Sequence, residues 1–125
     1  MARKALMYTP DDAVPLPGPR REPPSPAQVE TAVIALRMLA DPTRLRILWH
    51  LAAHEYDVSS LTAEVGASRP AVSQHLGKLR LAGLVTVRRD GRRAVYSARG
   101  GHVRRMLAEV LSTADHQLTG AADHD

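Results

Sequence analysis

Residues 58–98 constrain the fold of this chain more than any other stretch, because they combine two short helical patterns with a hairpin pattern. The first pattern, over residues 59–65, places Leu61 and Val65 four residues apart on one helical face. Gly66 follows and favours the end of this helix. The stretch therefore begins with a short helix and a tight turn.

A second helix is predicted directly after this turn. Ser68 is a suitable N-cap, and Pro70 falls in the first turn, where its missing N–H costs nothing. Gly83 is placed to end the helix. The apolar stripe consists of Val72, Leu76 and Leu79. Polar side chains lie off this stripe, so the pair of helices has the pattern of a helix-turn-helix, whose second helix fits the major groove of B-DNA.

A two-stranded hairpin with an arginine-rich tip is predicted next. Val85 and Val87 alternate with polar residues at period two, and Asp90-Gly91 is a strong signal for the central residues of a hairpin turn. Four guanidinium groups crowd the tip and would repel one another, whereas a phosphate backbone relieves that repulsion. The side chains expected to contact DNA are Arg69, Ser73, Gln74, His75, Lys78, Arg88, Arg89, Arg92 and Arg93.

Charge distribution supports this interpretation. The formal net charge of the 125-residue chain is +4, and residues 69–105 contain ten basic residues against one acid, Asp90. Arginine in place of lysine is explained by genome composition, but its clustering is not. The sequence therefore indicates nucleic-acid binding.

Three parts are expected along the chain. Residues 1–26 hold seven of the nine prolines and are interpreted as a disordered arm. Residues 27–118 form the winged helix-turn-helix domain, and residues 119–125 form a flexible tail rich in acids and histidine. The fold class is mainly α (α+β), with about five helices and a two-stranded wing.

Two helices precede the helix-turn-helix and one follows the wing. The first, over residues 27–40, is apolar around so much of its circumference that we expect it to dimerise. The second begins sharply at Asp41 and Pro42. The last, over residues 101–118, is expected to pack against the first helix and a partner subunit. A homodimer would also enlarge a core that is small for a chain of this length.

Several classes of protein are disfavoured. The chain has no cysteine, which removes disulfides and thiolate metal sites. It shows neither a catalytic triad nor a phosphate-binding glycine loop, so we do not expect an enzyme. We find no apolar run of membrane-spanning length. Arg3 and Lys4 are not followed by the hydrophobic segment of a signal peptide, so a cytoplasmic protein is expected.

Three motifs in order resemble the ArsR/SmtB family of bacterial metal-sensing repressors. They are MLADPTRLRIL at residues 38–48, PAVSQHLGKLRLAGLV at residues 70–85 and RRDGRRAVYSA at residues 88–98. The resemblance covers roughly residues 29–116. It implies a homodimeric winged helix that represses transcription by binding double-stranded operator DNA at an inverted repeat.

The resemblance also bears on metal binding. One family site needs a cysteine pair, but Asp57 and Ser59 occupy those positions here. The other site lies on the last helices. His102 and His116 match two of the ligand positions of the zinc sensors, whereas the other half of the zinc ligands are missing. The end of the chain is more similar to the KmtR/NmtR-type nickel/cobalt sensors. This similarity implies that His102, Asp115, His116 and His124 are the ligands, with Ni²⁺ or Co²⁺ as the metal and Zn²⁺ as an alternative.

Geometry favours a site shared between subunits. His102 and His116 are fourteen residues apart, which is about 21 Å along a helix, so one chain cannot hold an ion between them. Two antiparallel copies of this helix would bring His102 of one chain to Asp115 and His116 of the other, giving two sites per dimer. The alternative is a regulator of the same fold that does not sense metal, in which these histidines are ordinary exposed side chains.

A second candidate metal pair, His50 and His54, is more simply explained as surface histidines near a helix end.

Overall fold

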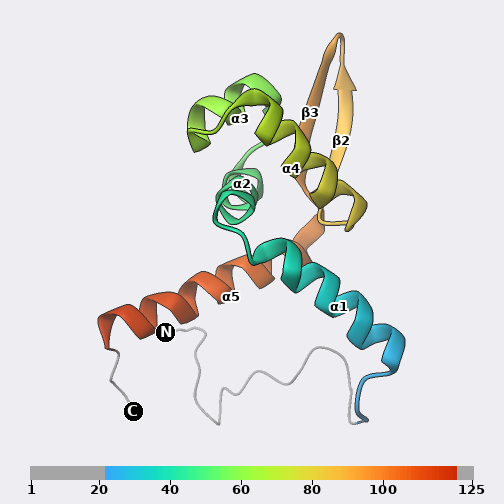
Figure 1. Cartoon of the computed structure of the whole chain (residues 1–125), viewed down its shortest axis with the longest axis vertical. Helices are drawn as coiled ribbons and strands as arrows, with labels where there is room; N and C mark the ends of the chain where they lie inside the picture. Colours follow the sequence, from blue (N-terminus) through green and yellow to red (C-terminus); the bar gives the residue numbers. More distant parts are fainter. Residues whose placement is uncertain (1–21, 121–125) are drawn as a thin grey trace. The chain divides into compact units, whose positions relative to one another are not determined.

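The computed structural model describes residues 22–120, and this part of the chain contains five helices and three strands (Figure 1). In chain order these are α1 (Pro26–Leu39), α2 (Pro42–Ala53), β1 (Tyr56–Asp57), α3 (Val58–Val65), α4 (Arg69–Leu81), β2 (Val85–Asp90), β3 (Arg93–Ala98) and α5 (Gly100–Thr119). The predicted winged helix-turn-helix is confirmed: α3 and α4 form the helix-turn-helix, and β2 and β3 form the wing. Most of the predicted N-terminal arm and tail lies outside the described residues.

Side-chain oxygens cap the starts of α2, α3 and α4. An Asp41 carboxylate oxygen accepts a hydrogen bond from the Arg44 N–H at 2.9 Å, and Pro42 follows as expected. Ser68 caps α4 by accepting from the Ala71 N–H at 3.2 Å. The third cap is Asp57, which accepts from the Ser60 N–H at 2.8 Å. Because Asp57 caps it, α3 begins at Val58, one residue earlier than predicted.

The sheet has three strands in the order β1-β3-β2, all antiparallel, where the sequence analysis expected two strands. The additional strand is β1, in which Tyr56 pairs with Tyr96 and Asp57 with Val95. A strand of two residues is too short to show alternation, so its pattern could not reveal it. Its position matters, because β1 leads directly into α3 and joins the helix-turn-helix to the wing.

The hairpin turn differs by one residue from the prediction. Asp90 is the last residue of β2 and pairs with Arg93, so Gly91 and Arg92 are the central residues of the turn. Gly91 adopts a φ of +64°, as the first central residue of a two-residue hairpin turn requires. The register places buried Val85 opposite buried Ala98. A slip by one residue would turn these side chains to the solvent face, so burial at the base of the wing decides the turn at its tip.

The core is aliphatic and lies between α2, the helix-turn-helix and the base of the wing. Its fully buried side chains are Ile47, Leu48, Leu51, Leu61, Val72, Leu76, Leu79 and Val85. The predicted stripe on α4 is confirmed. On α2, Ile47 is fully buried and Leu45 is only half-buried.

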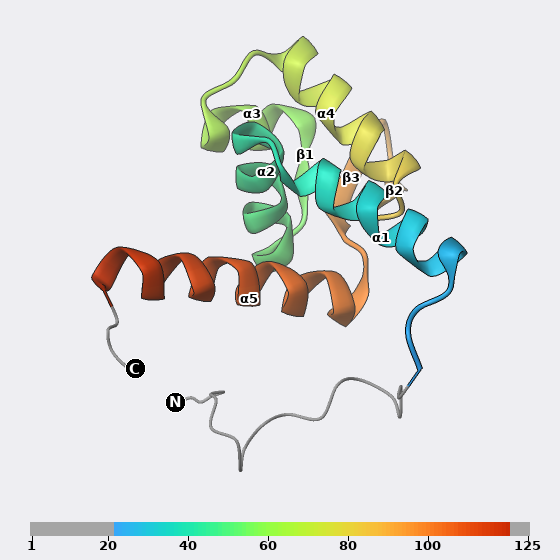
Figure 2. The same ribbon diagram turned by 60° about the horizontal axis from the view of Figure 1, so that its bottom comes forward.

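The last helix, α5, lies across one end of α2 (Figure 2). Val103 and Leu107 on its inner face are buried in the core. The predicted neighbour of this helix was α1, but the element against which it packs most is α2. Within residues 22–120, no helix is both long and apolar enough to cross a membrane.

Candidate nucleic-acid interface

The outer face of α4 is polar and exposed. Ser73, Gln74 and Lys78 are solvent-exposed, whereas the apolar stripe of the same helix is buried. Ser68 and Pro70 begin this helix immediately after the turn that follows α3. The fold thus presents hydrogen-bonding side chains on a helix held from behind, which is the arrangement that reads base edges in a major groove.

His75 differs from its neighbours on α4 because it is half-buried and linked to α2. Its Nδ1 lies 3.3 Å from an Arg44 guanidinium nitrogen, which donates to it. The Nε of Arg44 also donates to the Met38 carbonyl at 2.8 Å. Arg44 therefore ties α4 to the end of α1, and His75 faces the protein at least as much as it faces solvent.

Arg69 stands at the first position of α4 and is exposed. Its guanidinium donates a hydrogen bond to the hydroxyl oxygen of Ser59 on α3. This contact holds the arginine over the beginning of α3 rather than letting it extend freely into solvent.

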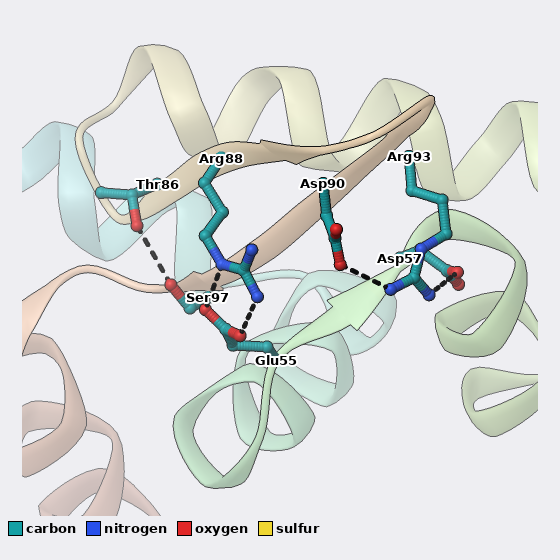
Figure 3. A network of polar contacts seen from close by, with 7 residues as sticks. All are labelled: Glu55, Asp57, Thr86, Arg88, Asp90, Arg93 and Ser97. Atoms are coloured by element: carbon teal, nitrogen blue, oxygen red, sulfur yellow. Dashed lines mark hydrogen bonds and ion pairs between the residues drawn. The ribbon is translucent and has the colours of Figure 1, made fainter.

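The wing carries two arginines that are paired with carboxylates of the protein (Figure 3). Arg88 forms a two-point contact with Glu55, at 2.8 Å through Nη2 and 3.1 Å through Nε. Arg93 bridges Asp57 and Asp90, each at 3.0 Å. Part of the repulsion expected at the tip is therefore relieved within the chain, since three carboxylates neutralise two of the arginines.

These contacts shift the ionisation of the acids. The hydrogen bond from Arg88 lowers the pKa of Glu55 below its ordinary value. The pKa of Asp57 is lowered first by the Ser60 backbone N–H at the α3 cap and further by Arg93. Both acids thus remain charged partners of the wing at neutral pH. Sequence reasoning missed their roles, because Glu55 lies 33 residues from Arg88 and Asp57 lies 36 residues from Arg93.

Arg89 and Arg92 form the remaining charge at the wing tip. Both side chains are exposed, and an Arg89 guanidinium nitrogen donates to the Arg92 carbonyl at 3.4 Å. Among residues 22–120, neither lies within ion-pair distance of a carboxylate. Two of the four wing arginines, Arg88 and Arg93, therefore pair with carboxylates of the protein, whereas Arg89 and Arg92 keep their charge exposed to solvent.

The candidate metal ligands that the structure describes all lie on α5. His102 is in its first turn, Asp115 and His116 are near its end, and all three are exposed. The Nδ1 of His102 accepts a hydrogen bond from Arg105 at 3.1 Å, which leaves Nε2 for another partner. His124 lies outside the described residues. No three histidine or acidic side chains within residues 22–120 gather closely enough in one chain to hold a metal ion.

The alternative histidine pair on α2 has aromatic neighbours. The His50 ring meets Trp49 and Tyr56 edge to face, with centroid distances of 5.0 Å and 5.7 Å. The two acids that follow this pair in sequence are already engaged, Glu55 by Arg88 and Asp57 by the α3 cap and Arg93. The contacts fit packing better than metal binding.

Comparison with known proteins identifies close relatives. Residues 41–87 match the family described as bacterial regulatory protein, arsR family. The transcriptional regulator KmtR of Mycobacterium tuberculosis is 44% identical over 97 residues, which cover 78% of this chain and 75% of that protein. NmtR of the same organism is 36% identical, with coverage of 83% and 89%.

Solved structures show the same fold. A homodimeric winged helix-turn-helix DNA-binding domain from Mycobacterium bovis, a possible ArsR-family transcriptional regulator, superposes with a TM-score of 0.73 at 32% identity, covering 79% of this chain and 92% of that chain. NolR from Sinorhizobium fredii gives a TM-score of 0.62 at 40% identity, with coverage of 74% and 95%.

Proposed function

The chain belongs to the arsR family of bacterial regulatory proteins, and we propose that it is a homodimeric, metal-responsive repressor. It is a DNA-binding transcriptional repressor of the ArsR/SmtB type, and the expectation that it is not an enzyme is confirmed by its relatives. The proposal adds its oligomeric state, its metal and the residues that bind the metal. Operator DNA is contacted by α4 and the wing.

Dimerisation through α1 and α5 is supported by apolar side chains that a single chain leaves in water. Ile34 and Leu36 on α1 are 45% and 55% exposed, and Val110 and Leu118 on α5 are 40% and 85% exposed. Exposed apolar side chains on two helices mark a surface for a partner. The related domain from Mycobacterium bovis is described as homodimeric.

One observation carries the metal proposal: the candidate ligands that the structure describes lie at opposite ends of α5, and their side chains are exposed. His102 lies in the first turn of α5, and Asp115 and His116 lie in its last two turns. An antiparallel pair of these helices about a twofold axis would join each His102 to the acid–histidine pair of the other chain. Imidazole and carboxylate ligands suit Ni²⁺ or Co²⁺, with Zn²⁺ as the alternative metal, and His124 is proposed as a further ligand.

Such a metal acts as a switch only if it binds one conformation of the dimer more tightly than the other. We propose that the metal-bound α5 helices favour a dimer whose two recognition helices no longer match half-sites about one helical turn apart. Metal then lowers operator affinity and releases repression.

The test is a titration of Ni²⁺ into the protein–operator complex, after an operator has been selected from random duplexes. We expect operator affinity to fall at least about fivefold, the lower end of typical allosteric coupling. His102→Ala and His116→Ala should bind operator normally and lose the response. An operator affinity that Ni²⁺, Co²⁺ and Zn²⁺ all leave unchanged overturns metal sensing but not repression.

The second candidate is a repressor of the same fold that does not sense metal. In it, His102, Asp115 and His116 are ordinary exposed side chains of α5. In that case the two histidine variants would behave as the unmodified protein does in every assay of DNA binding and repression.

A further inference from the structure

A surface pocket of about 360 Å³ lies between the start of α3, the start of α4 and the wing. Its polar lining consists of Asp57, Ser59, Arg69, Arg89, Arg92 and Arg93. Four arginines from two separate segments of the chain thus face one hollow that contains a single acid. Such a concentration of guanidinium groups around one acid leaves an excess of positive charge in the pocket.

The acid and one arginine of this pocket satisfy each other. Asp57 accepts from the Ser60 N–H at 2.8 Å and from Arg93 at 3.0 Å. Arg93 is also paired with Asp90. Because these groups already have partners of opposite charge, they add little net charge to the pocket.

The other three arginines have no such partner. Arg69, Arg89 and Arg92 are exposed, and none lies within ion-pair distance of a carboxylate among residues 22–120. The Ser59 hydroxyl and the Arg92 carbonyl accept from Arg69 and Arg89 respectively, which orients both guanidinium groups without neutralising them. A group with several negatively charged oxygens would complement all three, since guanidinium forks bind such oxygens in pairs.

We propose that this pocket binds one phosphate group, and that in the working complex it is a phosphate of the DNA backbone. The inference rests on the proposed function, in which α4 enters the major groove. The pocket adjoins the first residue of α4 on one side and the wing tip on the other. A backbone strand separates the major groove from the adjacent minor groove, so one of its phosphates lies between a helix in the first groove and a wing at the second.

This proposal divides the arginines of the interface by role. Arg69, Arg89 and Arg92 contact the phosphate, whereas Arg88 and Arg93 are positioning residues that fasten the wing to Glu55 and Asp57. The sequence alone assigns the same role to all four wing arginines.

The experiment measures how the binding of a mixed-sequence DNA duplex depends on salt. The slope of log affinity against log salt changes by about 0.9 for each phosphate that the protein neutralises. We expect each of Arg69→Ala, Arg89→Ala and Arg92→Ala to weaken the slope. The triple variant should lose the contribution of only about one phosphate per subunit, which is about two phosphates for the dimer. Three separate phosphates would instead cost the triple variant about three times as much. Arg99→Ala, which removes an exposed charge at the base of the wing, is the matched control and should leave the slope unchanged.

A loss of about three phosphates per subunit in the triple variant, which is about six for the dimer, or no loss at all, overturns the single-phosphate pocket. Thermal unfolding, monitored by circular dichroism, checks that the variants fold. We expect them to fold because all three side chains are exposed.

A second arm distinguishes DNA from a free phosphate compound. Inorganic phosphate is titrated into the unmodified protein and the triple variant at constant ionic strength, without DNA. If the triple variant loses saturable phosphate binding but keeps its DNA slope, the pocket serves free phosphates and the DNA assignment is overturned. If the unmodified protein binds no duplex, the proposed function fails, and phosphate binding lost in the triple variant still supports the pocket. If the unmodified protein then binds no phosphate either, the pocket is overturned as well.

Discussion

Arg88 on β2 and Glu55, which immediately precedes β1, form a two-point ion pair at 2.8 Å and 3.1 Å (Figure 3). Both side chains are about half exposed, with relative areas of 55% and 47%. An exposed pair of this kind contributes little to stability. Its consequence is electrostatic: the chain itself neutralises one guanidinium on the surface that we expect to face DNA.

The first prediction is that Glu55→Gln strengthens non-specific DNA binding. Without its carboxylate partner, the Arg88 of each subunit becomes available to one more phosphate, so the slope of log affinity against log salt should steepen by up to about 0.9 per subunit, or about 1.8 for the dimer. The measurement is the salt-dependent binding of a mixed-sequence duplex.

The matched control is Glu109→Gln, which removes the same charge from an exposed position on α5. An equal change in both variants would show that only the net charge matters and that the Arg88–Glu55 pair does not restrain the wing.

The second prediction concerns the caps of α2 and α4. Asp41→Ala and Ser68→Ala each remove a side-chain oxygen that accepts a backbone N–H at a helix start. Each should lower the free energy of unfolding by about 1 kcal/mol at neutral pH, measured by urea denaturation.

The two caps should respond differently to acid. The Arg44 backbone N–H, followed by the charges of Arg44 and His75, lowers the pKa of Asp41 below its usual 3.8. A lowered pKa in the folded state means that the charged cap stabilises fully above the unfolded value and loses this effect as pH falls through the folded value. The cost of Asp41→Ala should therefore shrink below about pH 4, whereas that of Ser68→Ala should not. Parallel pH profiles for the two variants would contradict this account.

Local signals predicted much of the fold. Asp41 with Pro42 and Ser68 with Pro70 predicted where α2 and α4 begin, because caps and prolines act within one turn of helix. The stripe of Val72, Leu76 and Leu79 predicted the buried face of α4. These features depend on neighbours in sequence, and a sequence displays such neighbours directly.

Long-range pairings were not predictable in the same way. β1 forms only because Tyr56 and Asp57 meet β3 about 40 residues later, and two residues carry no periodic pattern. The ion pairs of Glu55 and Asp57 likewise depend on the placement of the wing against β1. The sequence therefore predicted the basic residues of the candidate site, but not the acids that pair with two of them.

The third prediction uses two glycines in different conformations. Gly91 has a φ of +64° at the wing turn, and a β-carbon there would meet no atom within 4 Å. Gly91→Ala should therefore destabilise the protein through backbone strain alone, by about 1 kcal/mol. Gly91→Asn should cost less, because Asn tolerates the left-handed region better.

Gly77, inside α4, provides the control with the opposite sign. A β-carbon there also meets nothing within 4 Å, but the backbone is helical. Gly77→Ala should stabilise the protein by about 0.5–1 kcal/mol, because alanine has the higher helix propensity. Urea denaturation of both variants checks the pair, and destabilisation by both would point to packing rather than backbone conformation.

The fourth prediction tests whether the metal site is shared between subunits. If His102 of one chain works with Asp115 and His116 of the other, homodimers of His102→Ala and of His116→Ala should each lose high-affinity Ni²⁺ binding. A mixed dimer of the two variants would contain one site with both substitutions and one intact site. After subunit exchange of an equal mixture, about half of the dimers are mixed, so Ni²⁺ capacity should recover to about one quarter of that of the unmodified protein. Equilibrium dialysis measures the capacity. A site formed within a single chain predicts no recovery on mixing, since every chain would still lack one of its two histidines.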